Sequence, residues 1–162
     1  MLTYKRLHLI CQKNKEGAGY IGLNSIQHPN FDYAYISGKW VLDKATAQSL
    51  LGGLIFLHEA KTKTSHFGGL IYDWEYTPDM AKPTEDRISF KFLAVADGRY
   101  VRWGGKDHVM AWQSGIVMPD EAIIIDTPTQ QRHVGRGLRK LADIPEDFVL
   151  DLQARALQTY SD

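Results

Sequence analysis

The polar loop at residues 61–66 holds the densest group of side chains that could do chemistry. It reads Lys-Thr-Lys-Thr-Ser-His and joins two apolar segments, 54–58 (LIFLH) and 68–76 (GGLIYDWEY). If these segments are neighbouring strands, the loop presents cations, hydroxyls and an imidazole at one rim of a sheet. The segment 37–40 (SGKW) follows another apolar stretch and is expected to face the same rim. The candidate ligand-binding residues from these segments are Ser37, Lys39, Trp40, Lys61, Lys63, Ser65 and His66.

Two further stretches contain basic residues and no acidic residue. Residues 99–106 (RYVRWGGK) interleave arginines with Tyr100 and Trp103, and residues 132–140 read RHVGRGLRK. Cations neutralise phosphates and aromatic faces stack on bases, and stacking is worth about 1–3 kcal/mol per base. These stretches therefore predict contacts with DNA or RNA through Arg99, Arg102, Trp103 and Arg136. The alternative is that the aromatic rings belong to the core and the arginines to an ordinary solvated edge.

The second basic stretch also contains a pattern typical of a phosphate-binding loop. Arg132-x-x-Gly135-x-Gly137 resembles the pyrophosphate loop of GNAT acetyltransferases, where backbone N–H groups at a helix start hold cofactor phosphates. This resemblance implies a second candidate function, a small acyltransferase-like enzyme that binds a phosphate-bearing cofactor at Arg132–Gly137. The residues after Gly137 are too few to complete that fold. The leading prediction therefore assigns no catalytic residue and no cofactor.

Other groups of reactive side chains lack the spacing that their chemistry requires. Imidazole and carboxylate groups at His58, Glu59 and His66 would suit zinc or iron, but the chain contains no HExxH or CxxC motif. The histidines and serines are not accompanied by the G-x-S-x-G turn that positions a serine nucleophile. The sequence therefore predicts neither a metal site nor a serine hydrolase.

Composition limits the class of protein. A chain of 162 residues with 44% hydrophobic residues is long enough for one domain to bury a core without staples. Its 19 basic and 19 acidic residues exclude a generally basic coat but allow a local basic patch. The single cysteine, Cys11, favours a reducing compartment, and no segment approaches the ~20 apolar residues of a membrane helix. We expect one cytoplasmic domain over residues 1–162, away from the membrane, with a homodimer or a protein partner left open.

The elements that position these side chains are predicted to be mostly strands. In residues 87–96 the side chains of Ile88, Phe90 and Phe92 alternate with polar ones, and residues 70–76 alternate in the same way. Asp97-Gly98 predicts a tight turn into a further strand at 100–103. The remaining predicted strands are 6–11, 33–37, 54–58, 108–112 and 121–126. This number of short strands is typical of a sheet-rich domain.

Two helices are predicted besides the strands. Asp43 is a suitable N-cap for a helix over 44–51, which would end at Gly52-Gly53. A second helix is predicted over about 144–158, with Asp143 and Glu146 at capping-box spacing and an apolar stripe along one face. A short helix at 136–142 is also compatible with the sequence. The paired glycines at 52–53 and 68–69, and Gly38, allow close backbone approach, either to a ligand or between strands.

The layout of residues 30–126 resembles the PUA-like superfamily of small barrels, which includes EVE, ASCH and YTH domains. The resemblance rests on YAYIS at 33–37 followed by GKW, the short helix, GGLIFLH at 52–58 and SHFGGLI at 65–71. It implies an α+β fold built on a small β-barrel of about six to seven strands, with a short helix after an early strand and a C-terminal helix.

The same resemblance implies a function. Domains of this superfamily recognise nucleic acid, often through a modified base held in an aromatic-lined pocket, and Ser37, Lys39 and Trp40 match the segment after the first barrel strand. The ASCH-type G-x-K-x-x-E-x-R pattern is absent, because the GKW at 38–40 lacks the following Glu and Arg. The sequence therefore predicts a non-catalytic nucleic-acid-binding domain, with a modified base in DNA or RNA as one candidate target.

Overall fold

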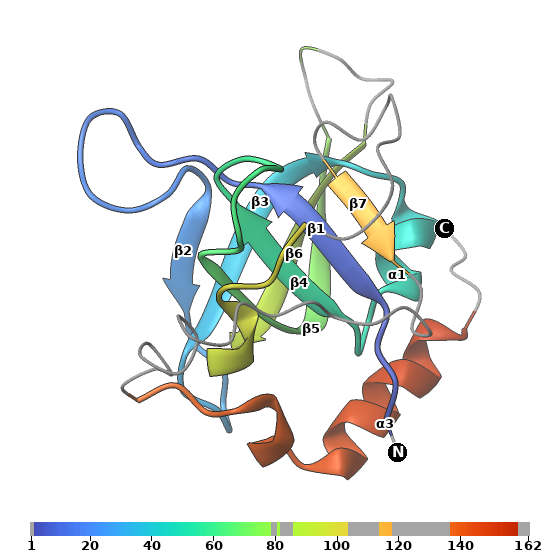
Figure 1. Cartoon of the computed structure of the whole chain (residues 1–162). Helices are drawn as coiled ribbons and strands as arrows, with labels where there is room; N and C mark the ends of the chain where they lie inside the picture. Colours follow the sequence, from blue (N-terminus) through green and yellow to red (C-terminus); the bar gives the residue numbers. More distant parts are fainter. Residues whose placement is uncertain (1, 79–80, 82–85, 104–113, 118–136, 159–162) are drawn as a thin grey trace.

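A single mixed sheet dominates the computed structural model, which describes residues 2–78, 81, 86–103, 114–117 and 137–158 (Figure 1). Together with two α-helices in this part of the chain, the sheet makes an α+β fold. The sheet has seven strands in the order β2-β3-β6-β5-β4-β1-β7. Their bounds are β1 Arg6–Ile10, β2 Leu23–Ile26, β3 Ala34–Val41, β4 Leu54–His58, β5 Phe67–Pro78, β6 Asp86–Ala94 and β7 Ser114–Val117.

The sheet is open rather than closed. β1 and β4 are parallel and every other neighbouring pair is antiparallel. The strand order ends at β2 on one side and β7 on the other, and no hydrogen-bonded pair joins these two within the described residues. The described residues therefore show an open sheet in place of the expected small β-barrel. Alternation predicts a half-buried strand in either arrangement, because it carries no information about whether the first and last strands pair.

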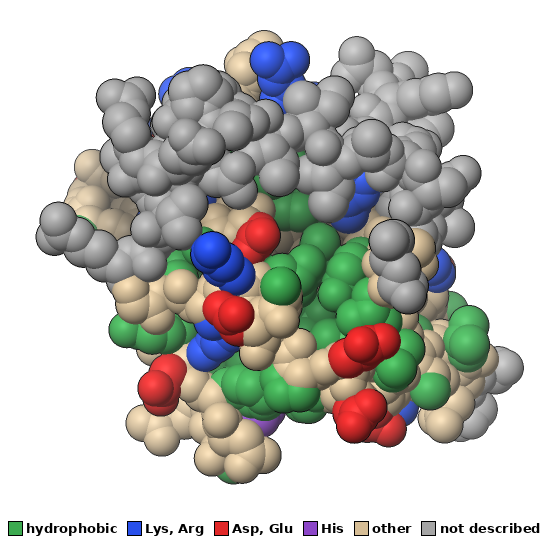
Figure 2. Space-filling model, turned by 60° about the horizontal axis from the view of Figure 1, so that its bottom comes forward, with side chains coloured by type: hydrophobic (Ala, Val, Ile, Leu, Met, Phe, Trp, Pro, Cys, Tyr) green, Lys and Arg blue, Asp and Glu red, His purple; other side chains and the backbone are tan. Residues whose placement is uncertain are grey.

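Both faces of the sheet are covered, and β4 shows how. Ile55 and Leu57 point into one core cluster, which includes Ala47 of α1 (Lys44–Ser49). Leu54 and Phe56 point into a second cluster, which includes Val149 and Leu152 of α3 (Glu146–Ala156). Successive strand residues face opposite sides, so a strand covered on both sides is apolar throughout. Figure 2 shows the face on the side of α3, where a hydrophobic strip is bordered by acidic side chains.

The helix after β3 begins as the sequence predicts. The Asp43 Oδ1 accepts a hydrogen bond of 2.8 Å from the Thr46 backbone N–H, which satisfies one of the unpaired donors at the start of α1. The chain leaves the helix through Gly52, whose φ of +78° is in the left-handed region that favours glycine.

Removal of this cap is expected to destabilise the protein moderately. In Asp43→Ala the Thr46 N–H loses its acceptor, and such a loss typically costs about 1 kcal/mol of stability. The Asp43→Asn variant keeps an acceptor oxygen at the same place and should unfold in urea close to the wild-type midpoint. Equal midpoints for wild type and Asp43→Ala would show that the cap does not stabilise the fold.

The C-terminal region differs from its prediction in detail. The second α-helix is confirmed as α3, but its N-cap is Pro145, and the Asp143 carboxylate instead accepts from the Lys140 backbone N–H at 3.0 Å. That bond closes the short 3-10 helix η2 (Leu141–Asp143), which overlaps only the end of the helix that the sequence allowed over 136–142, since residues 138–140 are not helical. A short acidic side chain bonds whichever nearby N–H is unpaired, so its spacing alone does not identify the helix it caps.

The segment after β6 is the largest local error of the sequence-based prediction. Residues 96–98 form the 3-10 helix η1 (Ala96–Gly98) rather than a hairpin turn, and 100–103 is not a ladder strand. Instead the Tyr100 N–H donates to the Ser65 carbonyl at 2.8 Å, and the Ser65 N–H donates to the Val101 carbonyl at 2.7 Å. The predicted strands at 108–112 and 121–126 lie outside the described residues, and β2 and β7 were not predicted at all.

The paired glycines serve close strand packing. A Cβ at Gly69 would overlap the Leu93 carbonyl oxygen, and one at Gly68 would overlap the Ile55 carbonyl oxygen. A Cβ at Gly38 would overlap the Ser89 hydroxyl in the same way. The sequence analysis allowed these glycines to approach either a ligand or a neighbouring strand, and the structure supports close approach between strands.

Candidate functional site

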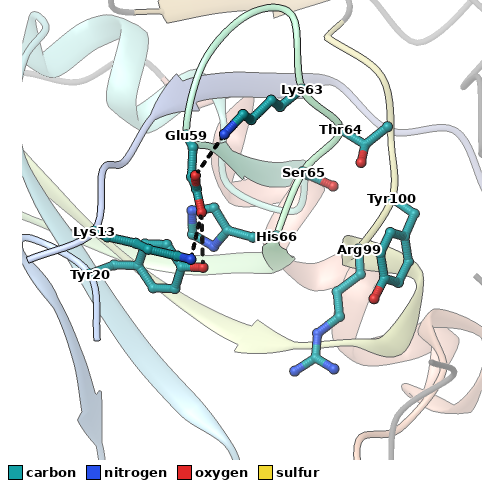
Figure 3. Close-up of a pocket in the computed structure, with 9 residues that line it drawn as sticks. All are labelled: Lys13, Tyr20, Glu59, Lys63, Thr64, Ser65, His66, Arg99 and Tyr100. Atoms are coloured by element: carbon teal, nitrogen blue, oxygen red, sulfur yellow. Dashed lines mark hydrogen bonds and ion pairs between the residues drawn. The ribbon is translucent and has the colours of Figure 1, made fainter. Parts of the chain in front are cut away.

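A hollow of about 660 Å³ opens where the loop between β4 and β5 meets the segment after η1 (Figure 3). Arg99 and Tyr100 lie across it from Lys13, Tyr20 and Glu59. We call it the cationic hollow, because its wall carries three cations and one carboxylate. Its lining residues are Lys13, Tyr20, Glu59, Lys63, Thr64, Ser65, His66, Arg99 and Tyr100.

Ser65 joins the two segments that form this hollow. Its hydroxyl donates to the Gly98 carbonyl at 2.7 Å and accepts from the Val101 N–H at 3.0 Å. The residue is only 1% exposed, so the hydroxyl is committed to the chain and does not face a ligand. Ser65 therefore positions the site. It brings Lys63 and Arg99, which come from two separate predicted stretches, to one hollow.

A stack of two rings forms one wall of the cationic hollow. The rings of Tyr20 and His66 are nearly parallel at 5°, with centroids 3.7 Å apart. The His66 Nε2 lies 3.0 Å from the Cys11 carbonyl oxygen, which only accepts, so the proton is on Nε2. Burial lowers the pKa of His66, so the ring is neutral at pH 7. Its Nδ1 is buried and has no partner among the described residues.

Glu59 arranges the lysines of the hollow. Its carboxylate is 3.2 Å from the Lys63 ammonium, 3.5 Å from the Lys13 ammonium, and accepts from the Tyr20 hydroxyl at 3.4 Å. The hydrogen bond from Lys63 is the main reason that the pKa of Glu59 is lowered. With Glu59 ionised and His66 neutral, Arg99 and the two lysines leave an excess of positive charge. The hollow therefore attracts anions.

A second hollow, of about 380 Å³, contains Trp40 and is called the tryptophan hollow. The Trp40 Nε1 donates to the Ser37 hydroxyl at 3.4 Å, and Ser37 is fully buried. Ser37 therefore holds the indole in place and does not itself contact a ligand. The lining residues are Ile10, Cys11, Gln12, Ile21, Gly38, Lys39, Trp40, Val41 and Arg87.

The two hollows are neighbours but not one site. Lys13 and Tyr20 line the cationic hollow, whereas the adjacent Gln12 and Ile21 line the tryptophan hollow. The expectation that 37–40 and 61–66 share a rim is therefore corrected, because the chain between β1 and β2 separates them. Lys13 and Tyr20 were missed by the sequence analysis, since nothing in their spacing indicates that this connection folds over the β4–β5 loop.

Trp103 packs against the interior of the protein. Its ring centroid is 5.0 Å from that of His58 and 5.6 Å from that of His8, and the Lys61 ammonium lies 5.6 Å from the same centroid. For Trp103 the structure thus favours the core reading over an open stacking surface. Arg102 is exposed and lines neither hollow. Arg136 lies outside the described residues, as does the Arg132–Gly137 loop except for Gly137 itself.

Beneath the cationic hollow, His8 and His58 form a buried pair whose hydrogen positions follow from geometry. The His58 Nδ1 lies 2.8 Å from the Lys63 carbonyl oxygen and must donate to it. The His58 Nε2 therefore accepts from the His8 Nδ1 at 2.9 Å. Burial is the main reason that the pKa of His8 falls to about 3 and that of His58 to about 4. This neutral pair supports the loop that carries Lys63.

Comparison with protein-family models, curated proteins and solved structures gives no match. The class that fold and site define is thus an α+β domain with a cationic hollow beside a tryptophan-containing one. In the described part of the chain, no helix is long and apolar enough to cross a membrane. Nor do three His, Cys, Asp or Glu side chains there gather closely enough to hold a metal ion.

Proposed function

We propose that the protein is a non-catalytic nucleic-acid-binding domain of the PUA-like kind. The observation that carries this proposal is the cationic hollow, which both Lys63 and Arg99 line although they belong to separate stretches of the sequence. Lys13 adds a third cation. Phosphates are the polyanionic groups that such a hollow binds, and each phosphate contact releases a condensed counterion.

The tryptophan hollow supplies what a base requires. Trp40 and Ile21 give it apolar walls, while Gln12 and Lys39 add polar groups able to hydrogen-bond to a base edge. We propose that a base, including a modified one, enters here while its neighbouring phosphates lie in the cationic hollow. Extrusion of a base costs a few kcal/mol, which stacking and edge hydrogen bonds offset.

Binding without catalysis fits the state of the reactive groups in the cationic hollow. The Ser65 hydroxyl has both a donor and an acceptor partner in the chain. His66 uses its N–H on the Cys11 carbonyl and is neutral, and Glu59 is engaged by two lysines. Within the described residues no basic side chain contacts the Ser65 hydroxyl, and the one hydroxyl that Glu59 accepts from is the phenol of Tyr20, at 3.4 Å.

The double variant Lys63→Gln/Arg99→Gln is expected to weaken binding and to flatten its salt dependence. Loss of two phosphate contacts should lower the magnitude of the slope of log K against log salt by about two, since each contact contributes about one. The measurement is fluorescence anisotropy of labelled single- and double-stranded DNA and RNA over a series of salt concentrations. Oligonucleotides with methylated or hydroxymethylated cytosine in the same titrations test the modified-base part of the proposal.

A matched control separates phosphate contact from general charge. Arg155 of α3 is exposed and lines neither hollow, so Arg155→Gln should leave the slope close to that of the wild type. Lys63 is exposed and Arg99 is half-buried beside the Phe67 ring, so the double variant should remain folded with a small loss of stability, which a thermal melt measures. Unchanged affinity and slope in the double variant, or no binding to any oligonucleotide at low salt, would disprove the proposed function.

A further inference from the structure

Residues 12–21 form a hairpin loop that projects from the body of the protein (Figure 1) and is joined by one isolated β-bridge; we call it the ribbon. Lys13 and Tyr20 are bridged, the Ile21 N–H donates to the Gln12 carbonyl at 2.9 Å, and the Asn14 N–H donates to the Gly19 carbonyl at 3.0 Å. Residues 12–19 are all exposed, and a Cβ at Gly17 would meet nothing within 4 Å. The ribbon therefore reaches into open space.

The ribbon is flanked by cations on both sides. Its Lys13–Tyr20 pair faces the cationic hollow with Lys63 and Arg99, and its neighbouring Gln12–Ile21 pair faces the tryptophan hollow. Successive residues of a strand point to opposite faces, which explains why one short ribbon lines two hollows. The cations of the tryptophan hollow are Lys39 and Arg87. Cations therefore lie beside the base of the projecting ribbon on each of its two faces, together with the Glu59 carboxylate on one of them.

This arrangement matches the shape of a duplex groove. The major groove of B-DNA is about 12 Å wide and 8.5 Å deep, admits a two-stranded β-ribbon, and has a phosphate backbone along each side. We propose that the ribbon at residues 12–21 enters the major groove of double-stranded DNA, with the cations of the two hollows against the two backbones. This inference rests on the proposed function and specifies its ligand. Double-stranded RNA is disfavoured, because the major groove of an A-form helix is deep and narrow.

The side chains of the ribbon suit this place. Asn14 and Lys15 are of the types that bond base edges in the major groove, where amides bind adenine and ammonium groups bind guanine. The Asn14 Nδ2 also donates to the Ala18 carbonyl at 3.1 Å, which steadies the turn. The tip itself is Gly17-Ala18-Gly19, whose small side chains allow the backbone to approach a base closely.

The test compares duplex and single-stranded DNA of one sequence, with the full chain and with a variant whose ribbon is shortened. In that variant an Asn-Gly pair replaces residues 14–19, a loop that keeps the strands before and after it paired. The wild type should bind the duplex more tightly than the single strand. The shortened variant should bind the duplex about tenfold or more weakly than the wild type, since this is the contribution of one bidentate base contact. Its affinity for the single strand should be unchanged.

A point variant and a chemical probe make the test independent of how well the shortened chain folds. Lys15→Gln should reduce duplex affinity several-fold, whereas Lys140→Gln, an exposed lysine that lines neither hollow, should not. Methylation of guanine N7, which lies in the major groove, should interfere with binding.

Three results would overturn the inference. These are equal or tighter binding of the single strand, full duplex affinity in Lys15→Gln together with insensitivity to N7 methylation, and tighter binding of duplex RNA. In each of them nucleic acid still binds and the proposed function stands. Failure to bind any nucleic acid at low salt would instead remove the proposed function and this inference with it.

Discussion

The protein is expected to lose stability steeply as the pH falls from about 6.5 towards 4. His8 and His58 have pKa values of about 3 and about 4 in the folded protein, against an ordinary value of 6.5. Below pH 6.5 the unfolded chain therefore binds protons that the folded chain excludes, which favours unfolding. The stabilisation is complete above pH 6.5 and is lost as the pH falls through the folded values.

The size of the effect follows from the gap between the folded and unfolded pKa values. A tenfold difference in proton affinity between the two states corresponds to about 1.4 kcal/mol, so this pair alone accounts for a loss of several kcal/mol by pH 4. His66 adds to the effect, because burial lowers its pKa too. Two neighbouring side chains also oppose protonation of the pair. Arg6 lowers the pKa of His8, and His66 lowers the pKa of His58. Glu59 also stabilises the fold less in acid, but only below about its ordinary pKa of 4.5.

The measurement is the urea midpoint at a series of pH values between 7 and 4. In His8→Gln one of the two low-pKa groups is absent, so the midpoint should fall less steeply between pH 6.5 and 4.5 than in the wild type. Burial also lowers the pKa of His28, which lies outside the pair, so His28→Gln should change the steepness in the same direction but less than His8→Gln does. If His8→Gln is too unstable to measure, NMR titration of the imidazole signals in the wild type tests the same prediction. Histidine signals that all titrate near 6.5 would contradict the prediction.

The sequence analysis did not predict the His8–His58 pair, and the arrangement of the strands explains why. His8 and His58 are 50 residues apart, and they meet because β1 and β4 are parallel neighbours in register, with His8 opposite Phe56 and Ile10 opposite His58. Neither residue has a local pattern that predicts this. By contrast, the Asp43 cap and the strand predicted over 87–96 depend on neighbours in sequence; the cap is present, and the strand is found as β6, Asp86–Ala94, with buried residues on both faces.

The same distinction applies to the candidate site. Lys63, His66 and Arg99 were selected for their chemical type, and the structure brings them to one hollow. Ser37 and Ser65 were selected by the same rule, but their hydroxyls bond Trp40 and the backbone. A sequence shows which groups are able to bind a ligand. It does not show which of them the fold already uses, because that depends on distant segments such as 98–101.

The second large effect is expected at Gly69, where Ala should cause a severe loss of stability. Gly69 lies in the middle of the sheet, paired with Ile55 of β4 and with Ala94 of β6. A Cβ there would overlap the Leu93 carbonyl oxygen and press on the ring of Phe92, which is fully buried. Because β5 is paired with a strand on each side, its backbone cannot move away from the atoms that the added Cβ overlaps. Overpacking of a core typically costs about 1–3 kcal/mol of stability, and we expect Gly69→Ala to cost about 3 kcal/mol or more.

Two features make this prediction sharp. Gly69 does not have a left-handed φ, so Ala is not strained at this position by the backbone conformation itself. If the strands could move apart freely, Gly69→Ala would therefore stabilise the fold slightly, because Ala restricts the unfolded chain. The matched control is Gly17→Ala on the ribbon tip, where the added Cβ meets no atom within 4 Å and only the left-handed φ is unfavourable. Urea unfolding should show a loss of about 1–2 kcal/mol at most for Gly17→Ala. A Gly69→Ala protein as stable as this control would show that β5 and β6 are less closely paired than the structure indicates.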